Sequence, residues 1–87
     1  MAHFAQLNGN TVQQVIVVSN DDCGGGDFPD SEPIGQAFIA SLGLPGEWLQ
    51  CSYHGSFRSA YPGPGWTYDE TNDEFVAPPA PPIAIDE

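Results

Sequence analysis

The stretch "VIVVSNDDCGGGDFPDSEPIGQAFIASLG", residues 15–43, sets out three kinds of local structure in succession. A run of β-branched residues predicts a strand, a segment with three consecutive glycines predicts a loop, and apolar residues three and four positions apart predict a helix. Phosphate-binding loops use the same order of elements. The first question is therefore whether these glycines bind a nucleotide.

The side chains around the glycines argue against a phosphate site. A Walker loop needs Lys and then Ser or Thr after its glycines, and the dinucleotide fingerprint needs spaced glycines that open the helix directly. Here Gly24 to Gly26 are consecutive, and acidic residues surround them: Asp21, Asp22, Asp27, Asp30 and Glu32. Carboxylates would repel a triphosphate, so we interpret residues 20–32 as a flexible, solvated loop between strand and helix.

The same acidic loop invites a comparison with calcium loops. Asp21, Asp27 and Glu32 stand at positions 1, 7 and 12 of an EF-hand loop. Positions 3 and 5, which should supply side-chain oxygens, are Cys23 and Gly25, and a strand precedes the loop where the motif requires a helix. We reject an EF-hand, while weaker and irregular calcium binding by this loop stays an open alternative.

Composition and charge bound the class of protein. The 87 residues contain one Arg, no Lys and 12 acidic residues, for a formal net charge of −11. Such a charge repels phosphate backbones and anionic lipid surfaces, so we expect neither nucleic acid nor membrane as a partner. An apolar content of 40% with 11% aromatic residues predicts a folded domain. We expect one soluble domain over residues 1–78, without an export signal.

The N-terminus predicts a β-hairpin. Two extended runs, His3–Leu7 and Thr11–Ser19, flank Asn8-Gly9-Asn10, and Asn-Gly supplies the positive φ angles that a tight turn needs. The second strand is apolar on both faces from Val15 to Val18. Such a strand lies inside a sheet or against a partner, which makes Val15 and Val17 candidates for partner binding.

A single helix of about three turns should follow the glycine loop. Ser31 offers an N-cap hydroxyl, Glu32 an acidic residue in the first turn, and Gly43 a stop. We expect one apolar face of this helix to pack on the sheet. That face consists of Ile34, Ala37, Phe38 and Leu42.

Short runs rich in aromatic residues after the helix predict three or four further antiparallel strands. Trp66–Asp69 and Glu74–Ala77 should form a hairpin around a turn of polar residues. The predicted fold class is α+β, mainly β: a small antiparallel sheet with an N-terminal hairpin, one helix and these strands. Prolines exclude a central strand in residues 79–87, so we expect an extended Pro-rich arm there.

Candidate catalytic and metal-binding residues are few. Cys23, Cys51, His3 and His54 are the soft ligands, and no two of them share the short spacing that zinc sites use. Neither a strained nucleophile turn nor a base-orienting pattern accompanies Ser52 and His54. We expect no metal, no cofactor and no enzymatic activity, and both thiols should be reduced, as in cytosolic proteins.

The aromatic side chains admit an interpretation as a carbohydrate-stacking surface. The candidates are Trp48, Tyr53, Phe57, Tyr61, Trp66 and Tyr68. A small sheet must bury most of its large side chains to be stable, which favours core positions for them. We interpret Arg58 as an internal or inter-subunit salt partner rather than a catalytic group.

The second half of the chain carries a distinctive residue pattern. It reads W-x-Q-x-S-Y-x-G-x-x-R-x-x-Y-x-G-x-G-x-x-Y-D and then D-x-F-x-x-P, at Trp48, Gln50, Ser52, Tyr53, Gly55, Arg58, Tyr61, Gly63, Gly65, Tyr68, Asp69, Asp73, Phe75 and Pro78. In this pattern the chain resembles small proteins encoded by tailed bacteriophages, and its first 20 residues look like the opening of those proteins. The resemblance covers most of residues 1–79 and implies a virion structural component.

On this resemblance we expect a capsid cement or decoration protein that binds the assembled head and stabilises it. The first alternative function is that of a tail or fibre accessory protein, and the second alternative is a carbohydrate-binding module for host attachment. Subunit contacts would supply burial that so small a chain lacks, so the expected partners are the major capsid protein or other virion proteins, and further copies of the chain. After synthesis in the host cytoplasm it would reside in the virion. The expected partner-binding residues are Val15, Val17, Arg58, Pro78, Pro79, Pro81, Pro82, Ile83 and Ile85.

Overall fold

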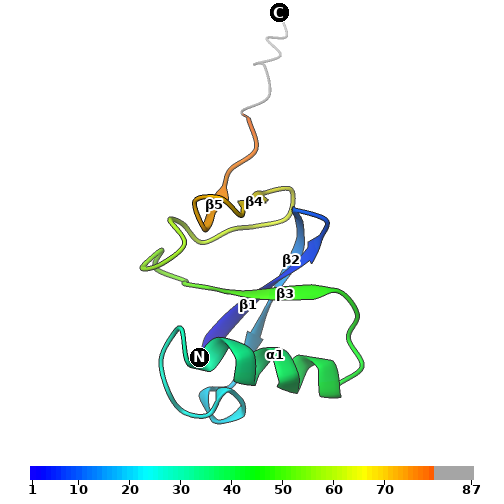
Figure 1. Cartoon of the computed structure of the whole chain (residues 1–87), viewed down its shortest axis with the longest axis vertical. Coiled ribbons are helices and arrows are strands. Elements are labelled where there is room, and N and C mark those ends of the chain that lie inside the picture. Colours follow the sequence, from blue (N-terminus) through cyan, green and yellow to red (C-terminus); the bar gives the residue numbers. More distant parts are fainter. Residues whose placement is uncertain (80–87) are drawn as a thin grey trace, which may run out of the picture.

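Two long strands form the centre of the structure, a computed structural model that describes residues 1–79 (Figure 1). Strands β1 (Ala2–Asn8) and β2 (Thr11–Val18) pair antiparallel, and Gly9 takes a φ of 65° in the turn between them. A β-bulge interrupts the register after Gln6. The predicted N-terminal hairpin is confirmed. Asn-Gly supplies the turn, and the flanking runs contain the β-branched residues and the apolar–polar alternation that favour strands.

Three shorter strands complete a five-stranded antiparallel sheet in the order β3-β1-β2-β4-β5. Strand β3 (Glu47–Cys51) pairs with β1, while β4 (Thr67–Asp69) and β5 (Glu74–Val76) form the predicted C-terminal hairpin. That hairpin joins the sheet through one residue pair, Thr11 with Thr67. The predicted mainly-β α+β fold is therefore confirmed.

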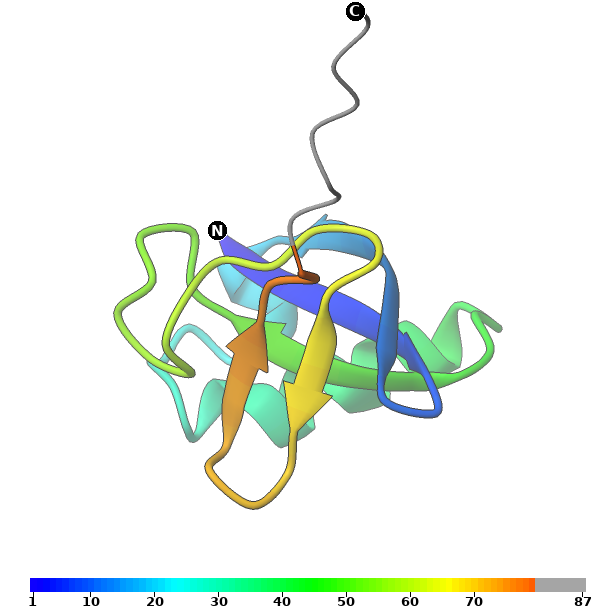
Figure 2. The ribbon, with the colours of Figure 1, turned by 90° about the horizontal axis from the view of Figure 1, so that it is seen from above.

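The sheet buries apolar side chains on both faces because successive residues of a strand point to opposite sides. Figure 1 shows helix α1 (Ser31–Ser41) on one side of the central strands and the β4–β5 hairpin on the other, and Figure 2 gives the same arrangement from above. The core under the helix consists of Ala2, Phe4, Val18, Cys23, Ile39 and Trp48. The core on the opposite face consists of Ala5, Leu7, Val12, Cys51 and Phe75.

The helix turns a different face to the sheet from the one predicted. Its buried residues are Ser31, Gly35 and Ile39, whereas Ile34 is 47% exposed and Leu42 57% exposed. The remaining members of the predicted face are Ala37, which is exposed, and Phe38, which is partly buried against the core. Close approach explains the difference: a Cβ atom at Gly35 would lie 2.3 Å from Cζ of Phe4, so only glycine lets the helix come this near.

The helix start also differs in detail. Asp30 is the N-cap residue and its side chain makes no capping hydrogen bond. Ser31, predicted as the cap, instead donates from Oγ to Oε1 of Gln50 at 2.7 Å in the buried interface between helix and β3. A buried hydroxyl needs a partner, and the side-chain oxygen of Gln50 supplies one.

The glycine segment has a defined backbone course. Residues Asn20–Cys23 form a 3-10 helix, η1, where an irregular loop was predicted. Gly24 ends this turn with a φ of 84°, and a Cβ atom there would lie 2.7 Å from Cδ1 of Ile34. Only glycine takes this conformation and this proximity without strain. The first of the three glycines is therefore required by the turn and by the helix that packs over it.

The two cysteines lie in different cores. Cys23 belongs to the cluster under α1 and Cys51 to the cluster on the opposite face, and both are free thiols. Burial raises the pKa of Cys51 to about 12, so this thiol stays protonated and is a poor nucleophile near neutral pH. Within residues 1–79, no helix has the length and apolar character needed to cross a bilayer.

Candidate interaction surface

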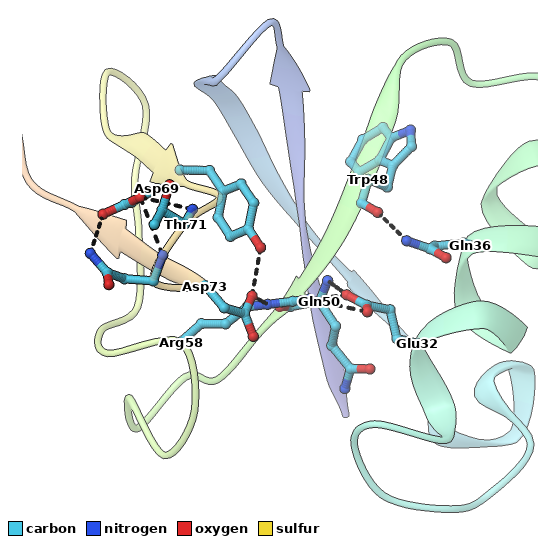
Figure 3. A network of polar contacts seen from close by, with 10 residues as sticks. Glu32, Gln36, Trp48, Gln50, Arg58, Asp69, Thr71 and Asp73 are labelled. Atoms are coloured by element: carbon cyan, nitrogen blue, oxygen red, sulfur yellow. Dashed lines mark hydrogen bonds and ion pairs between the residues drawn. The ribbon is translucent and has the colours of Figure 1, made fainter.

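Arg58 is the centre of the largest polar network, which Figure 3 shows between the helix and the C-terminal hairpin. Its guanidinium forms an ion pair with Glu32, with Nη1 and Nη2 each donating to one carboxylate oxygen. Nε donates to Oδ1 of Asp73 at 2.8 Å, and Nη1 also donates to the backbone oxygen of Gln50 at 2.9 Å. The Arg58 side chain is only 9% exposed. Its contacts in residues 1–79 are thus internal, and a role in partner binding stays a prediction.

The environment of Arg58 holds it charged. Burial alone would lower its pKa, but the hydrogen bonds and charges of Glu32 and Asp73 outweigh burial and raise the pKa above its ordinary value. The guanidinium carbon also lies 5.0 Å from the ring centre of Phe28 and 5.8 Å from that of Tyr68. These rings provide cation–π contacts on a group that water scarcely reaches.

The outer edge of β3 is closed by side chains. Oε2 of Glu32 accepts a hydrogen bond from the backbone N–H of Gln50 at 2.8 Å, and Nη1 of Arg58 donates to the carbonyl of the same residue. Nε2 of Gln36 donates to the carbonyl of Trp48 at 2.6 Å. Three of the backbone groups that an incoming strand would use on β3 are therefore already occupied: the carbonyl of Trp48 and both the N–H and the carbonyl of Gln50.

Strand β2 presents the opposite situation. Its pairing with β4 ends near Val12, whose N–H donates to the carbonyl of Trp66 at 2.7 Å and whose carbonyl accepts from Gly65 at 2.9 Å. Within residues 1–79, no backbone hydrogen bond beyond the β1 ladder reaches Gln13–Val18. Val15 is partly buried and Val17 is 52% exposed. This segment, which we name the open edge, is the part of the predicted partner site that the structure leaves accessible.

The remaining predicted partner residues lie elsewhere. Pro78 and Pro79 are exposed at the end of the described chain. Four further candidates lie outside the described residues: Pro81, Pro82, Ile83 and Ile85. The exposed apolar residues Ile34 and Leu42 were missed because their spacing indicated a core face. The glycine between them in sequence, Gly35, was the available signal for a different packing face.

The aromatic residues do not form the single surface considered for carbohydrate. Trp48 is 5% exposed in the core under the helix, and its indole N–H donates to the carbonyl of Pro45 at 3.2 Å. Tyr53 is 61% exposed and stacks on His3, with ring centres 5.4 Å apart. Tyr61 meets His3 edge-on at 5.5 Å. His3 and Tyr53 of this cluster line a depression together with polar residues that include Gln50 and Ser52.

Of the residues considered for metal binding or catalysis, His3, Cys51, Ser52 and His54 line one depression, whereas Cys23 lies in the core under the helix. In residues 1–79, no three His, Cys, Asp or Glu side chains converge so as to hold a metal ion. Glu32, which the calcium comparison placed at the end of the acidic loop, turns instead to Arg58. The hydroxyl of Ser52 accepts from the backbone N–H of Ser56 at 2.9 Å, which is a local turn contact.

No family model, curated protein or solved structure matches this chain. The resemblance to bacteriophage proteins stays a prediction. Its motif has a clear structural meaning, because Gln50, Arg58, Tyr68 and Asp73 meet in the Arg58 network. A pattern of this kind maintains a fold, and it does not by itself mark a ligand site.

The network also predicts how stability responds to alkali. Burial and the hydrogen bond donated to Asp73 at 2.6 Å raise the pKa of Tyr68 to about 12, from about 10 in an unfolded chain. A raised pKa contributes stability that is fully present below about pH 10 and is lost as pH rises towards 12. We expect urea unfolding to show this loss, and the Tyr68→Phe variant to lose less stability over the same range, since the raised pKa of Cys51 contributes equally to both proteins. An Asp73→Asn variant should move the Tyr68 titration to lower pH, and an unmoved titration would contradict this assignment.

Proposed function

We propose that this chain is a non-enzymatic structural component of a bacteriophage particle, and specifically a decoration protein that binds the assembled head. The observation that carries the proposal is that the positive charge of Arg58 is paired inside the domain, so that negative charge dominates the surface. The single Lys or Arg side chain of the sequence, Arg58, is 9% exposed and held by carboxylates of the same domain. The surface therefore offers acidic and apolar groups to a partner, and no Lys or Arg side chain stands free on it.

Such a surface suits attachment to a larger assembly. Large apolar side chains are exposed at Val17, Ile34, Leu42 and Leu44, although a domain of this size gains from burying them. The net charge of −11 favours basic patches on the partner and disfavours nucleic acid. The major capsid protein, or another virion protein, supplies a large repeated surface on which many copies bind.

Two other functions have to be distinguished from that of a decoration protein. A tail or fibre accessory protein would use the same surfaces but be present in few copies. The exposed ring of Tyr53, stacked on His3, is the feature that favours a carbohydrate-binding module. Such a module would show glycan-dependent changes in the resonances of these two side chains, which a decoration protein would not.

The experiment is quantitative mass spectrometry of purified particles, with the copy number of this chain compared with that of the major capsid protein. A decoration protein is expected in hundreds of copies on the head, and a handful of copies would transfer the chain to the tail. Absence from particles would overturn the proposal.

Deleting residues 79–87 should weaken association with the particle, while the circular dichroism of the isolated chain stays unchanged. Full occupancy of the particle after this deletion would exclude the arm as an anchor.

A further inference from the structure

The outer edge of β3 and the edge of β2 beyond its contact with β4 differ in how many of their backbone groups are hydrogen bonded. On β3, side chains from the helix and Arg58 occupy the carbonyl of Trp48 and both backbone groups of Gln50. On β2, within residues 1–79, the open edge Gln13–Val18 has no such cover. In a strand with one neighbour, alternate residues direct their N–H and C=O groups away from it, and these groups can pair with another chain. The structure thus protects one edge and exposes the other.

We propose that the open edge pairs antiparallel with the open edge of a second copy, so that two sheets join into one continuous sheet across a twofold axis. This inference concerns the isolated chain and does not depend on the role in a particle. An antiparallel contact of a strand with itself is self-complementary, as a twofold interface requires. The added strand completes hydrogen bonds that the single chain leaves to water.

Side chains on both faces of the open edge favour a second strand beside it. Val15 and Val17 lie on the face that carries the core of Ala5 and Cys51. Ile16 lies on the helix face, where it packs with Phe38 against the other core and is only partly buried. A neighbouring strand would cover these apolar groups from the side and extend both cores.

Charge identifies the second strand as a copy of the same segment. Residues 11–18 carry no charged side chain, although the chain has a net charge of −11. A pairing centred on Ile16 places Val15 opposite Val17 of the second copy and Gln14 opposite Val18, and it leaves Asp21 beyond the paired residues. No like charges then face each other at the contact, whereas the acidic remainder of each copy repels the other. The neutral strand is the part of the molecule that two such acidic chains can share.

The test measures the mass of the full chain by sedimentation equilibrium at protein concentrations up to about 1 mM. The wild type is expected to form a dimer that tightens as salt screens the repulsion between the acidic copies. A Val17→Lys variant places a charge at the contact and should raise the dissociation constant about tenfold or more, with unchanged circular dichroism. The matched control is Val76→Lys, on the end strand β5 and 43% exposed, which should dimerise as the wild type does.

The outcomes decide whether a second copy or the chain's own C-terminal segment pairs with the open edge. A wild type that stays monomeric throughout this range, or a Val17→Lys variant that dimerises unchanged, overturns the proposal. The full-length double variant Ile83→Lys, Ile85→Lys tests the chain's own C-terminal residues as the occupant, and loss of dimer in that variant alone would also overturn it. Hydrogen exchange on the wild type gives a readout that needs no variant: amides between Gln13 and Val18 should gain protection as protein concentration rises, and concentration-independent exchange would contradict a second copy.

Discussion

Replacing Arg58 by Ala should destabilise the domain by about 3–5 kcal/mol, which is the cost expected when one partner of a buried ion pair is removed. The Glu32 side chain is 16% exposed and would lose the guanidinium that pairs with both of its oxygens. The carbonyl of Gln50 would lose its donor as well. Since a single small core seldom supplies more than about 3–5 kcal/mol, we expect the variant to be largely unfolded at room temperature.

Circular dichroism and urea titration of the full chain measure this effect. Asp73→Asn is the graded control: its side chain is 57% exposed, so its ion pair with Arg58 should contribute no more than about 1 kcal/mol. The double variant Arg58→Met, Glu32→Met removes both charges together and should recover much of the stability lost by Arg58→Ala. A loss below about 1 kcal/mol for Arg58→Ala would show that the network does not hold the domain together.

Substituting Gly35 by Ala should destabilise the domain by about 1–3 kcal/mol, although helix propensity alone would favour Ala by about 1 kcal/mol. The added Cβ would lie 2.3 Å from Cζ of Phe4, 2.7 Å from its Cε1 and 2.9 Å from Sγ of Cys23. Phe4 is 0% exposed, so its ring has no free volume to move into. The steric clash should therefore outweigh the gain in helix propensity, so that Gly35→Ala lowers the free energy of unfolding.

Urea unfolding of Gly35→Ala beside Gly26→Ala tests that sign. A Cβ atom at Gly26 meets nothing within 4 Å, so this control should lie within about 0.5 kcal/mol of the wild type. A Phe4→Leu substitution makes room at the contact, and the double variant with Gly35→Ala should be more stable than the sum of the two single effects predicts. A stabilised Gly35→Ala protein would mean that helix and sheet are not in close contact.

Several elements could be predicted from the sequence because they depend on neighbours in the chain. The N-terminal hairpin follows from Asn-Gly between two extended runs, and the C-terminal hairpin from polar turn residues between aromatic strands. The helix follows from its stop at Gly43 and its length. Each of these signals is local, and each was confirmed.

The packing face of the helix could not be predicted in the same way. Apolar spacing favoured Ile34 and Leu42, but steric fit to Phe4 selected the face of Gly35. Hydrophobicity describes what a residue gains from burial, and not which of two adjacent faces allows the closer approach. Likewise, Glu32 was correctly predicted in the first turn of the helix, but its contact with Arg58, 26 positions away, depends on the fold.

The sequence by itself determined the two hairpins and the helix of this protein, its acidic charge and the neutrality of β2, since all of these are properties of residue type and of near neighbours. Only the tertiary structure decided that Glu32, Gln36 and Arg58 cover the edge of β3, while the edge of β2 is left open by residues 1–79. The physical reason is that an edge is closed by groups distant in sequence, whose positions depend on how helix, sheet and hairpin pack together.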